Sequence, residues 1–235
     1  MALYDRDYIQ NKSANGSYSQ TQERSQSNIS AFIKQTYQLF AASLLAASAG
    51  ASVGIGMDSV VAGFFWGFVI LEFALLFGLY AAKRKAGLNL VLLFGFTFVS
   101  GLTLAPLLTS VLGLPGGASI VANAFTLTTV AFGGLSVFAM NTKRDFGAMG
   151  KMLFITLIVV VVAGLMNLFF KSPVFQLAIA SVSSILFSAF ILYDTQNIIK
   201  GRYETPIEGA IALYLDFLNL FVSLLQIFGI LGRDE

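Results

Sequence analysis

Long apolar stretches, separated by short polar or glycine-containing breaks, fill the chain from about residue 35 onward. A helix that crosses the hydrocarbon core of a bilayer needs about 20 apolar residues, and seven stretches reach that length. They lie at residues 35–57, 59–82, 88–112, 118–140, 149–170, 174–199 and 209–231. The pattern therefore predicts an all-α membrane protein, a seven-transmembrane-helix bundle.

The N-terminal region has a different pattern. Residues 1–33 are mostly polar and rich in Ser, Asn and Gln, a composition typical of a disordered segment. No apolar stretch follows closely on the start, so we do not expect a signal peptide. The chain thus divides into a disordered cytoplasmic tail over residues 1–33 and a seven-helix transmembrane domain over residues 34–235.

Composition agrees with this division. The chain is 57% hydrophobic and 11% charged, whereas soluble domains carry about 25% charged residues. It contains no cysteine and no histidine, which removes disulfides, thiolate chemistry, the usual metal ligand and the usual pH switch. No combination of nucleophile, base and orienting group stands out, so we do not expect an enzyme.

Basic residues indicate the orientation in the membrane. Lys and Arg accumulate in the cytoplasmic loops of membrane proteins. With seven spans, all but two of the 14 basic residues fall on one side, the exceptions being Lys171 and Arg233. We therefore expect a cytoplasmic N-terminus and an external C-terminus.

Three acidic residues lie inside apolar stretches: Glu72, Asp194 and Asp216. An ionised side chain in hydrocarbon is costly unless it is paired, protonated or wetted, so such residues mark functional sites. From a rise of about 1.5 Å per residue, Asp194 lies roughly 8 Å, Asp216 roughly 10 Å and Glu72 roughly 15 Å from the cytoplasmic ends of their helices. Helices joined by a short loop are usually antiparallel neighbours, so we expect the two aspartates to meet.

A polar stripe runs along the last stretch. Asp216, Asn219, Ser223 and Gln226 are three or four residues apart and share one helical face. Asp194 and Asn197 share a face of the preceding helix. The amides and hydroxyls also fit an ordinary role as hydrogen bonds between helices. For two carboxyl groups this is a costly role, which favours a functional site.

Two carboxylates at one site cannot easily both ionise, so such a pair would share a proton near neutral pH and titrate as a unit. Carboxylate oxygens also suit calcium, a hard cation. The residues therefore predict a proton-sensitive cation site at Asp194 and Asp216, and they do not choose the ion.

Two motifs in the final third resemble a known family. Residues 193–196 read Tyr-Asp-Thr-Gln, and residues 210–221 read Ala-Ile-Ala-Leu-Tyr-Leu-Asp-Phe-Leu-Asn-Leu-Phe. Together they resemble the Bax inhibitor-1 family, also called the transmembrane Bax inhibitor motif family, and the chain is similar to its YccA-like bacterial branch. The resemblance implies a seven-helix fold in which the last helix is central.

The resemblance also implies a pH-sensitive calcium leak. By motif, Asp194 and Asp216 would form its sensor on the cytoplasmic side. Glu72 resembles an additional acidic residue of the pore, and either Lys83 or Arg84 would be the basic residue that latches the pair in the closed state.

A second function follows from the same resemblance. YccA-like members modulate a membrane-bound AAA protease, and the tail could serve that role or a link to stress and cell-survival machinery. The expected location is the bacterial inner membrane. Expected partners are the lipid bilayer, protons and calcium as the permeant or bound ion, with no other cofactor and no nucleic acid.

Overall fold

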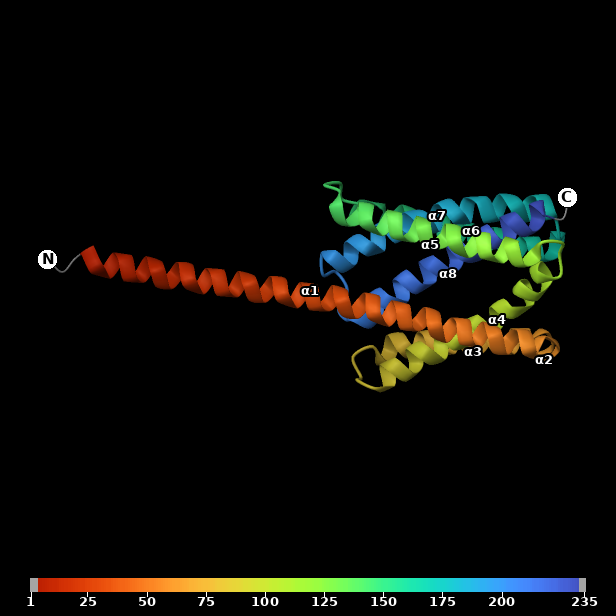
Figure 1. The fold of residues 1–235 in the computed structure, drawn as a ribbon, viewed down its shortest axis with the longest axis horizontal. Helices are drawn as coiled ribbons and strands as arrows, with labels where there is room; N and C mark the ends of the chain where they lie inside the picture. Colours follow the sequence, from red (N-terminus) through yellow and green to blue (C-terminus); the bar gives the residue numbers. More distant parts are fainter. Residues whose placement is uncertain (1–3, 233–235) are drawn as a thin grey trace.

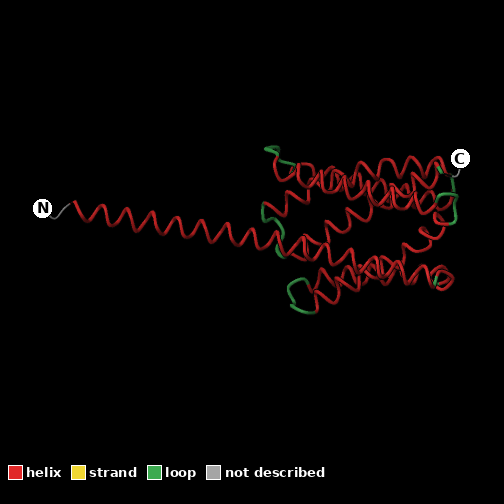
Figure 2. Tube along the Cα trace, in the orientation of Figure 1, coloured by secondary structure: helices red, strands yellow, loops and turns green. Residues whose placement is uncertain are grey.

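The computed structural model describes the backbone of residues 4–232 and the side chains of residues 27–232. The described chain is helical throughout, and short loops join the helices at the two ends of the bundle (Figure 2). The helices are α1 (Tyr4–Gly56), α2 (Asp58–Gly63), α3 (Phe65–Ala82), α4 (Leu88–Leu112), α5 (Gly117–Asn141), the 3₁₀ helix η1 (Gly147–Met149), α6 (Gly150–Phe170), α7 (Pro173–Ile199) and α8 (Pro206–Leu231).

Seven helical segments in the described chain are long and apolar enough to cross a membrane, as predicted. The first of them is Ser27–Gly56, which begins earlier than the predicted start at residue 35. The disorder predicted for residues 1–33 falls mostly on residues whose side chains lie outside the described part of the chain, and it stays a prediction.

The predicted second span, residues 59–82, was wrong at its N-terminal end. The chain forms the short helix α2, turns at Phe64, and only then begins the membrane-length helix Phe65–Ala82. Gly63 precedes the turn, and glycine weakens a helix because of its backbone freedom. Hydrophobicity alone did not reveal this break.

The helices form two layers with α8 between them. In Figure 1, α5, α6 and α7 lie on one side, α1, α3 and α4 lie on the other, and α8 crosses obliquely between the layers. Helix α8 packs against α1, α4, α5 and α7. In the apolar stretch of α8 that could cross a membrane, 50% of the residues are buried, compared with 44% in α4 and fewer in the other spans. The predicted central position of the last helix is confirmed.

The start of α8 is fixed by its own sequence. Thr205 accepts a hydrogen bond from the Glu208 N–H, the Glu208 side chain accepts one from the Thr205 N–H, and Pro206 occupies the first turn. Such a capping box satisfies amides that the first turn leaves unpaired. One turn or more further on, buried apolar residues hold α8 in the core, and Phe217 packs edge-on against Phe132, with ring centroids 5.6 Å apart.

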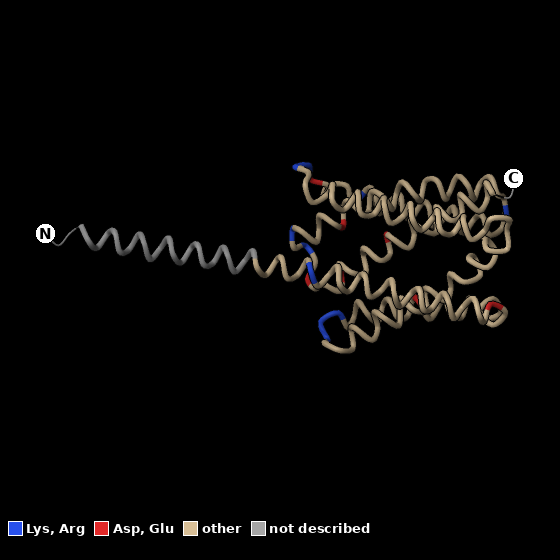
Figure 3. The backbone as a smooth tube through the Cα atoms, in the orientation of Figure 1, with Lys and Arg blue, Asp and Glu red and all other residues tan. Residues whose placement is uncertain are grey.

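The outer faces and the ends of the bundle differ in polarity. Many large apolar side chains, such as Phe169 and Ile185, are exposed, as expected where lipid covers them. Most of the blue segments in Figure 3 gather at the loops after α3, after α5 and after α7, at one end of the bundle, and one lies at the opposite end, near the C-terminus. Basic residues therefore gather mostly in the loops at one end of the bundle, and exposed apolar side chains cover the helices between the two ends.

Candidate functional site

The carboxyl groups of Asp194 on α7 and Asp216 on α8 meet in the interior. The two side chains are close enough to interact and line the same cavity, and they are 6% and 3% exposed. Two carboxyl groups can share a hydrogen bond only when one of them carries a proton. The structure therefore brings together the two residues expected to meet, in an arrangement that favours a shared proton.

The two aspartates have unequal surroundings. Asp194 Oδ1 accepts hydrogen bonds from the Tyr203 hydroxyl at 2.7 Å and from Asn197 Nδ2 at 3.3 Å. Asp216 Oδ2 is buried and has no hydrogen-bond partner among the described residues. Donors stabilise a negative charge, so Asp194 is the better location for the charge of the pair and Asp216 the better location for its proton.

Tyr203 reaches the pair from the loop between α7 and α8. The loop turns at Gly201, whose φ of 62° lies in the left-handed region that glycine adopts without strain. The Arg202 N–H then donates to the Asn197 carbonyl at 2.8 Å. The next residue, Tyr203, thereby lies close enough to the pair for its hydroxyl to reach Asp194. Burial and the neighbouring Asp194 carboxyl group raise the pKa of Tyr203 far above its ordinary value. Tyr203 therefore stays a hydrogen-bond donor.

A cavity of about 540 Å³ extends from the pair between α6, α7 and α8. The predicted polar stripe lies along it: Asp216, Asn219, Ser223 and Gln226 all line the cavity. Asn219 Nδ2 and Ser223 Oγ donate to carbonyls of their own helix at 2.7 and 2.6 Å. Their oxygen atoms can still accept hydrogen bonds, so the stripe presents acceptors to whatever enters the cavity.

At the other end of the stripe, three amide side chains are linked in series. Asn167 Nδ2 donates to Gln176 Oε1 at 2.7 Å, and Gln176 Nε2 donates to Gln226 Oε1 at 2.9 Å. These residues come from α6, α7 and α8. Sequence reasoning singled out Gln226 but missed its two partners, because isolated amides in apolar helices carry no distinctive spacing.

Glu72 lies apart from the aspartates. It is half-buried on α3, and its Oε2 accepts a hydrogen bond from Thr103 Oγ1 of α4 at 3.0 Å. It is not among the residues that line the cavity of the pair. Nearby, Tyr214 on α8 hydrogen-bonds Ser100 on α4. The structure therefore places Glu72 in a separate polar contact between α3 and α4.

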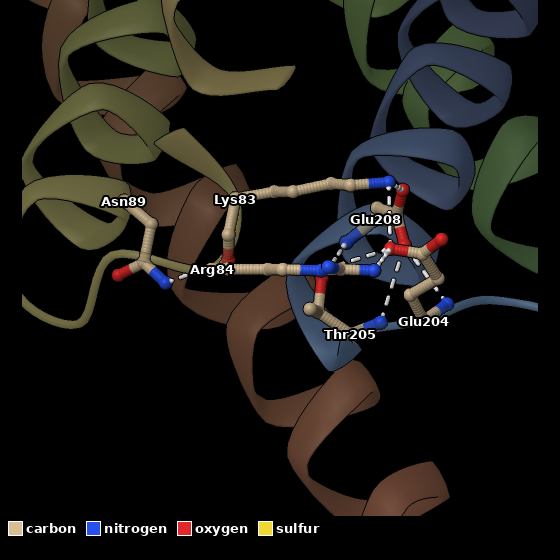
Figure 4. Close-up of polar contacts among 6 residues, drawn as sticks. All are labelled: Lys83, Arg84, Asn89, Glu204, Thr205 and Glu208. Carbon is tan, nitrogen blue, oxygen red and sulfur yellow. Dashed lines mark hydrogen bonds and ion pairs between the residues drawn. The ribbon is translucent and has the colours of Figure 1, made fainter. Parts of the chain in front are cut away.

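Lys83 and Arg84 form ion pairs beyond the end of α3 (Figure 4). Lys83 Nζ lies 2.5 Å from Glu208 Oε1 and 3.0 Å from Glu204 Oε2, and Arg84 Nη2 lies 2.7 Å from Glu204 Oε2. The hydrogen bond to Glu208 is the main cause of a raised pKa at Lys83. In the described part of the chain, these two basic residues tie α3 to the start of α8 and are not paired with Asp194 or Asp216.

The basic residue that is linked to the pair is Arg202. Its Nη1 donates to Asn197 Oδ1 at 3.1 Å, and Asn197 in turn donates to Asp194. Arg202 and Tyr203 follow each other in the last loop, so a single turn supplies both contacts. Sequence reasoning missed both, since a loop residue has neither helical spacing nor membrane depth.

The pair does not form a complete calcium site. No group of three or more Asp, Glu, His or Cys side chains able to hold a metal ion occurs within the described residues. Calcium usually takes about six to eight oxygen ligands. Two carboxyl groups and the acceptor oxygens of the stripe supply only part of such a ligand set.

The chain is similar to a known protein family and to individual proteins of bacteria and of a virus. The family described as "Inhibitor of apoptosis-promoting Bax1" matches residues 29–233. An uncharacterized protein of Campylobacter jejuni is 63% identical over 234 residues, covering 97% of each chain. An uncharacterized membrane protein of Vibrio cholerae is 38% identical over 208 residues, covering 86% of this chain and 91% of the relative. The Golgi anti-apoptotic protein of Vaccinia virus (strain Lister) is 34% identical over 205 residues, covering 84% of each chain.

The matched range includes both aspartates, six of the seven membrane-length segments of the described chain in full, and all but the first two residues of the segment Ser27–Gly56. Relatives of the chain occur in bacteria and in a virus. The chain is therefore an integral membrane protein that belongs to the Bax inhibitor-1 family.

Proposed function

We propose that the protein is a pH-sensitive calcium-permeable leak whose sensor is the pair Asp194 and Asp216. One observation carries the proposal: two buried carboxyl groups lie close together at the end of a cavity lined by a polar stripe. Two buried carboxylates this close would repel each other, so a pair that holds one proton is favoured. Loss of the proton replaces attraction with repulsion between α7 and α8, so the position of these helices depends on pH.

The polar stripe supports the permeation part of this proposal. Acceptor oxygens of Asn219, Ser223 and Gln226 follow Asp216 along the cavity, over roughly 15 Å of helix. A cation that leaves the pair would meet an oxygen at each turn. The orientation that completes the proposal has the pair near the cytoplasmic face, the N-terminus in the cytoplasm and the C-terminus outside, in a bacterial inner membrane.

In this proposal Lys83 and Arg84 act on the pair indirectly. Tyr80, one turn before them on α3, lines the cavity of the pair. Their ion pairs with Glu204 and Glu208 fix the end of α3 against α8. A movement of α3 that broke these ion pairs would also move Tyr80 away from the cavity.

The test is calcium flux into liposomes that contain only the purified protein and an enclosed calcium indicator. The proposal predicts flux above that of protein-free liposomes, and a flux that changes with pH between about 6 and 8, where no histidine is present to titrate. Flux equal to that of protein-free liposomes across this range would contradict it.

A second function is a membrane interaction protein that modulates a membrane-bound AAA protease or cell-survival machinery. The observation that favours it is the viral relative, which is named an anti-apoptotic protein. The same liposomes separate the two functions, because an interaction protein gives no flux without its partner. Co-purification of a membrane-bound AAA protease from the native membrane, lost when residues 1–33 are removed, would support it.

A further inference from the structure

Two cavities meet at one hydrogen bond on the side of the bundle away from the aspartates. The cavity of the pair reaches Gln176 and Gln226 at its far end. A second cavity of about 290 Å³ begins at the same two residues and extends past Asn167 to Lys171 and Ser172, at the connection between α6 and α7. Gln176 and Gln226 therefore line both cavities, one on each side of their contact.

The contact between these glutamines is built from both helices and supported by a third. Gln176 Nε2 on α7 donates to Gln226 Oε1 on α8 at 2.9 Å. Asn167 on α6, which is buried, donates to Gln176 Oε1 and also accepts the Ser172 N–H, at 2.7 and 3.1 Å. The amide of Gln176 therefore accepts one hydrogen bond and donates another, and together they fix its orientation.

We propose that the Gln176–Gln226 hydrogen bond is a second closure of the path, in series with the aspartate pair. The proposal rests on the function proposed above, and it adds the residues that separate the cavity of the pair from the opposite side of the membrane. Separation of the two amides joins the cavities into one continuous passage. While the bond is formed, a proton lost at the pair opens only one end of the path.

The chemistry of this closure suits a leak for a hydrated cation. The two amides carry no charge, so they neither hold a cation tightly nor exclude it by charge. Their oxygens can replace water ligands of a hard cation when the bond between them opens. Their N–H groups would meet an anion equally well, and selection by charge therefore belongs to the aspartates.

The absence of cysteine from the chain allows a direct test of this closure. Ser223 lines the cavity of the pair about one turn before Gln226, and Ser223→Cys introduces a single thiol behind the proposed closure. A small, membrane-impermeant cationic thiosulfonate is applied separately to each face of membrane vesicles, and the rate of thiol modification is measured.

With both glutamines present, we expect slow modification from the face that carries the α6–α7 connection. Gln176→Ala or Gln226→Ala in the Ser223→Cys protein should raise that rate by about five- to tenfold, the change in population that loss of one amide hydrogen bond gives. The bond can be removed from either helix, so one variant that folds, as judged by size-exclusion chromatography and a melting curve, is sufficient.

Asn123→Ala is the matched control, since Asn123 is an exposed amide near the same end and lines a different cavity. It should leave the rate unchanged. Equal rates with and without Gln176 and Gln226, or an equal increase from Asn123→Ala, would overturn the closure. Modification needs no calcium, so this result is independent of whether calcium flux is found.

Discussion

At the scale of single residues, the two aspartates are not equivalent. Asp194 accepts hydrogen bonds from Tyr203 and Asn197, whereas Asp216 Oδ2 has no partner among the described residues. Asymmetric hydrogen bonding fixes which member of a carboxyl pair holds the charge. A pair of this kind titrates as a unit, and its donors determine the pH at which the proton is lost.

Tyr203→Phe removes the shorter of the two hydrogen bonds to Asp194 and leaves the ring in place. Because the hydroxyl stabilises the negative charge of the pair, its removal should shift the midpoint of calcium flux against pH to a higher pH. A shift of about one pH unit corresponds to one hydrogen bond to a charged group, roughly 1.4 kcal/mol. The measurement is the flux profile of both proteins in liposomes.

Tyr193→Phe is the control, because Tyr193 adjoins Asp194 in sequence but its hydroxyl lies against Gly150 at the start of α6. It should keep the parent profile. An unchanged midpoint for Tyr203→Phe, or the same shift in both variants, would remove Tyr203 from the sensor.

The sequence could identify part of this site. Asp194 and Asp216 stand out because carboxyl groups are costly in apolar helices, and the spacing of the α8 stripe fixes its face. The partners of the pair could not be read in this way. Tyr203 and Arg202 reach it only because the loop turns at Gly201, and loop geometry leaves no periodic signal.

At the scale of elements, the connection between α5 and α6 is held to the end of α7. Gln196 accepts from the Phe146 N–H at 2.8 Å and donates to the Arg144 carbonyl at 2.7 Å. Asp145, between them, pairs with Lys200 Nζ at 2.6 Å. These contacts join the loop to the helix that carries Asp194.

Asp145 gives this connection a pH dependence of its own. The hydrogen bond from Lys200, assisted by the Gly147 N–H, lowers the pKa of Asp145 from 3.8 to about 2. A carboxyl group whose pKa is lower in the folded state stabilises the fold above its ordinary pKa, and that contribution is lost as pH falls through the folded value. Asp145→Asn should therefore lose less thermal stability than the parent between about pH 4 and 2.

Melting curves in detergent over that range check the prediction. Lys200→Gln should reduce the acid sensitivity in the same way, since it removes the main cause of the lowered pKa. Parallel pH curves for the parent and both variants would contradict it.

The contact between α1 and α4 depends on glycine. The space that a Cβ on Gly50 would need is occupied by the backbone carbonyl of Phe98, and Gly54 faces Leu102 and Ala105 in the same interface. In the sequence, small residues recur every fourth position of the first span, at Ala42, Ala46, Gly50 and Gly54, and this pattern predicts close packing of helices. Neighbouring Ala47, buried at the same interface, completes the contact.

Gly50→Leu should separate α1 from α4. Overpacking of this kind usually lowers the free energy of unfolding by about 1–3 kcal/mol. Gly56→Leu is the control, since no atom lies within 4 Å of a Cβ at that position. Thermal unfolding of both variants in detergent measures the difference. Equal melting temperatures would show that α1 and α4 can separate at little cost.

The elements also show the limit of hydrophobic patterning. It located all seven spans because membrane-length apolar runs are long and strongly marked. It could not show that α2 and α3 are separate, since Phe64 and Trp66 continue the apolar run across the turn. The break depends on backbone geometry, and apolarity is unchanged across it.

At the scale of the whole molecule, the charged loops and the two closures define an axis. The basic loops and the aspartate pair lie toward one end, and the glutamine contact lies toward the other. Lys171 lines the second cavity, where its positive charge opposes the entry of cations. In the proposed leak, this charge would favour slow passage of cations over rapid conduction.

The orientation of this axis is predicted from the loops. Reporter fusions before residue 1 and after Glu235 should place the N-terminus in the cytoplasm and the C-terminus outside. Both ends on one side would contradict the seven-span topology. The reverse orientation, with the ends on opposite sides, would contradict only the assignment of the basic loops to the cytoplasm.

The central claim is that the proton shared by Asp194 and Asp216 controls calcium flux. The most direct measurement is flux into liposomes between about pH 6 and 8 for the parent, Asp194→Asn and Asp216→Asn. Each amide keeps the shape of the side chain and removes one of the two carboxyl groups that would share the proton. Asp145→Asn is the control, because the pKa of Asp145 is about 2 and it does not titrate in this range.

We expect the parent and the Asp145→Asn protein to show the same pH dependence, and the two variants of the pair to give a flux that is nearly independent of pH. A parent profile retained in both Asp194→Asn and Asp216→Asn would contradict the account.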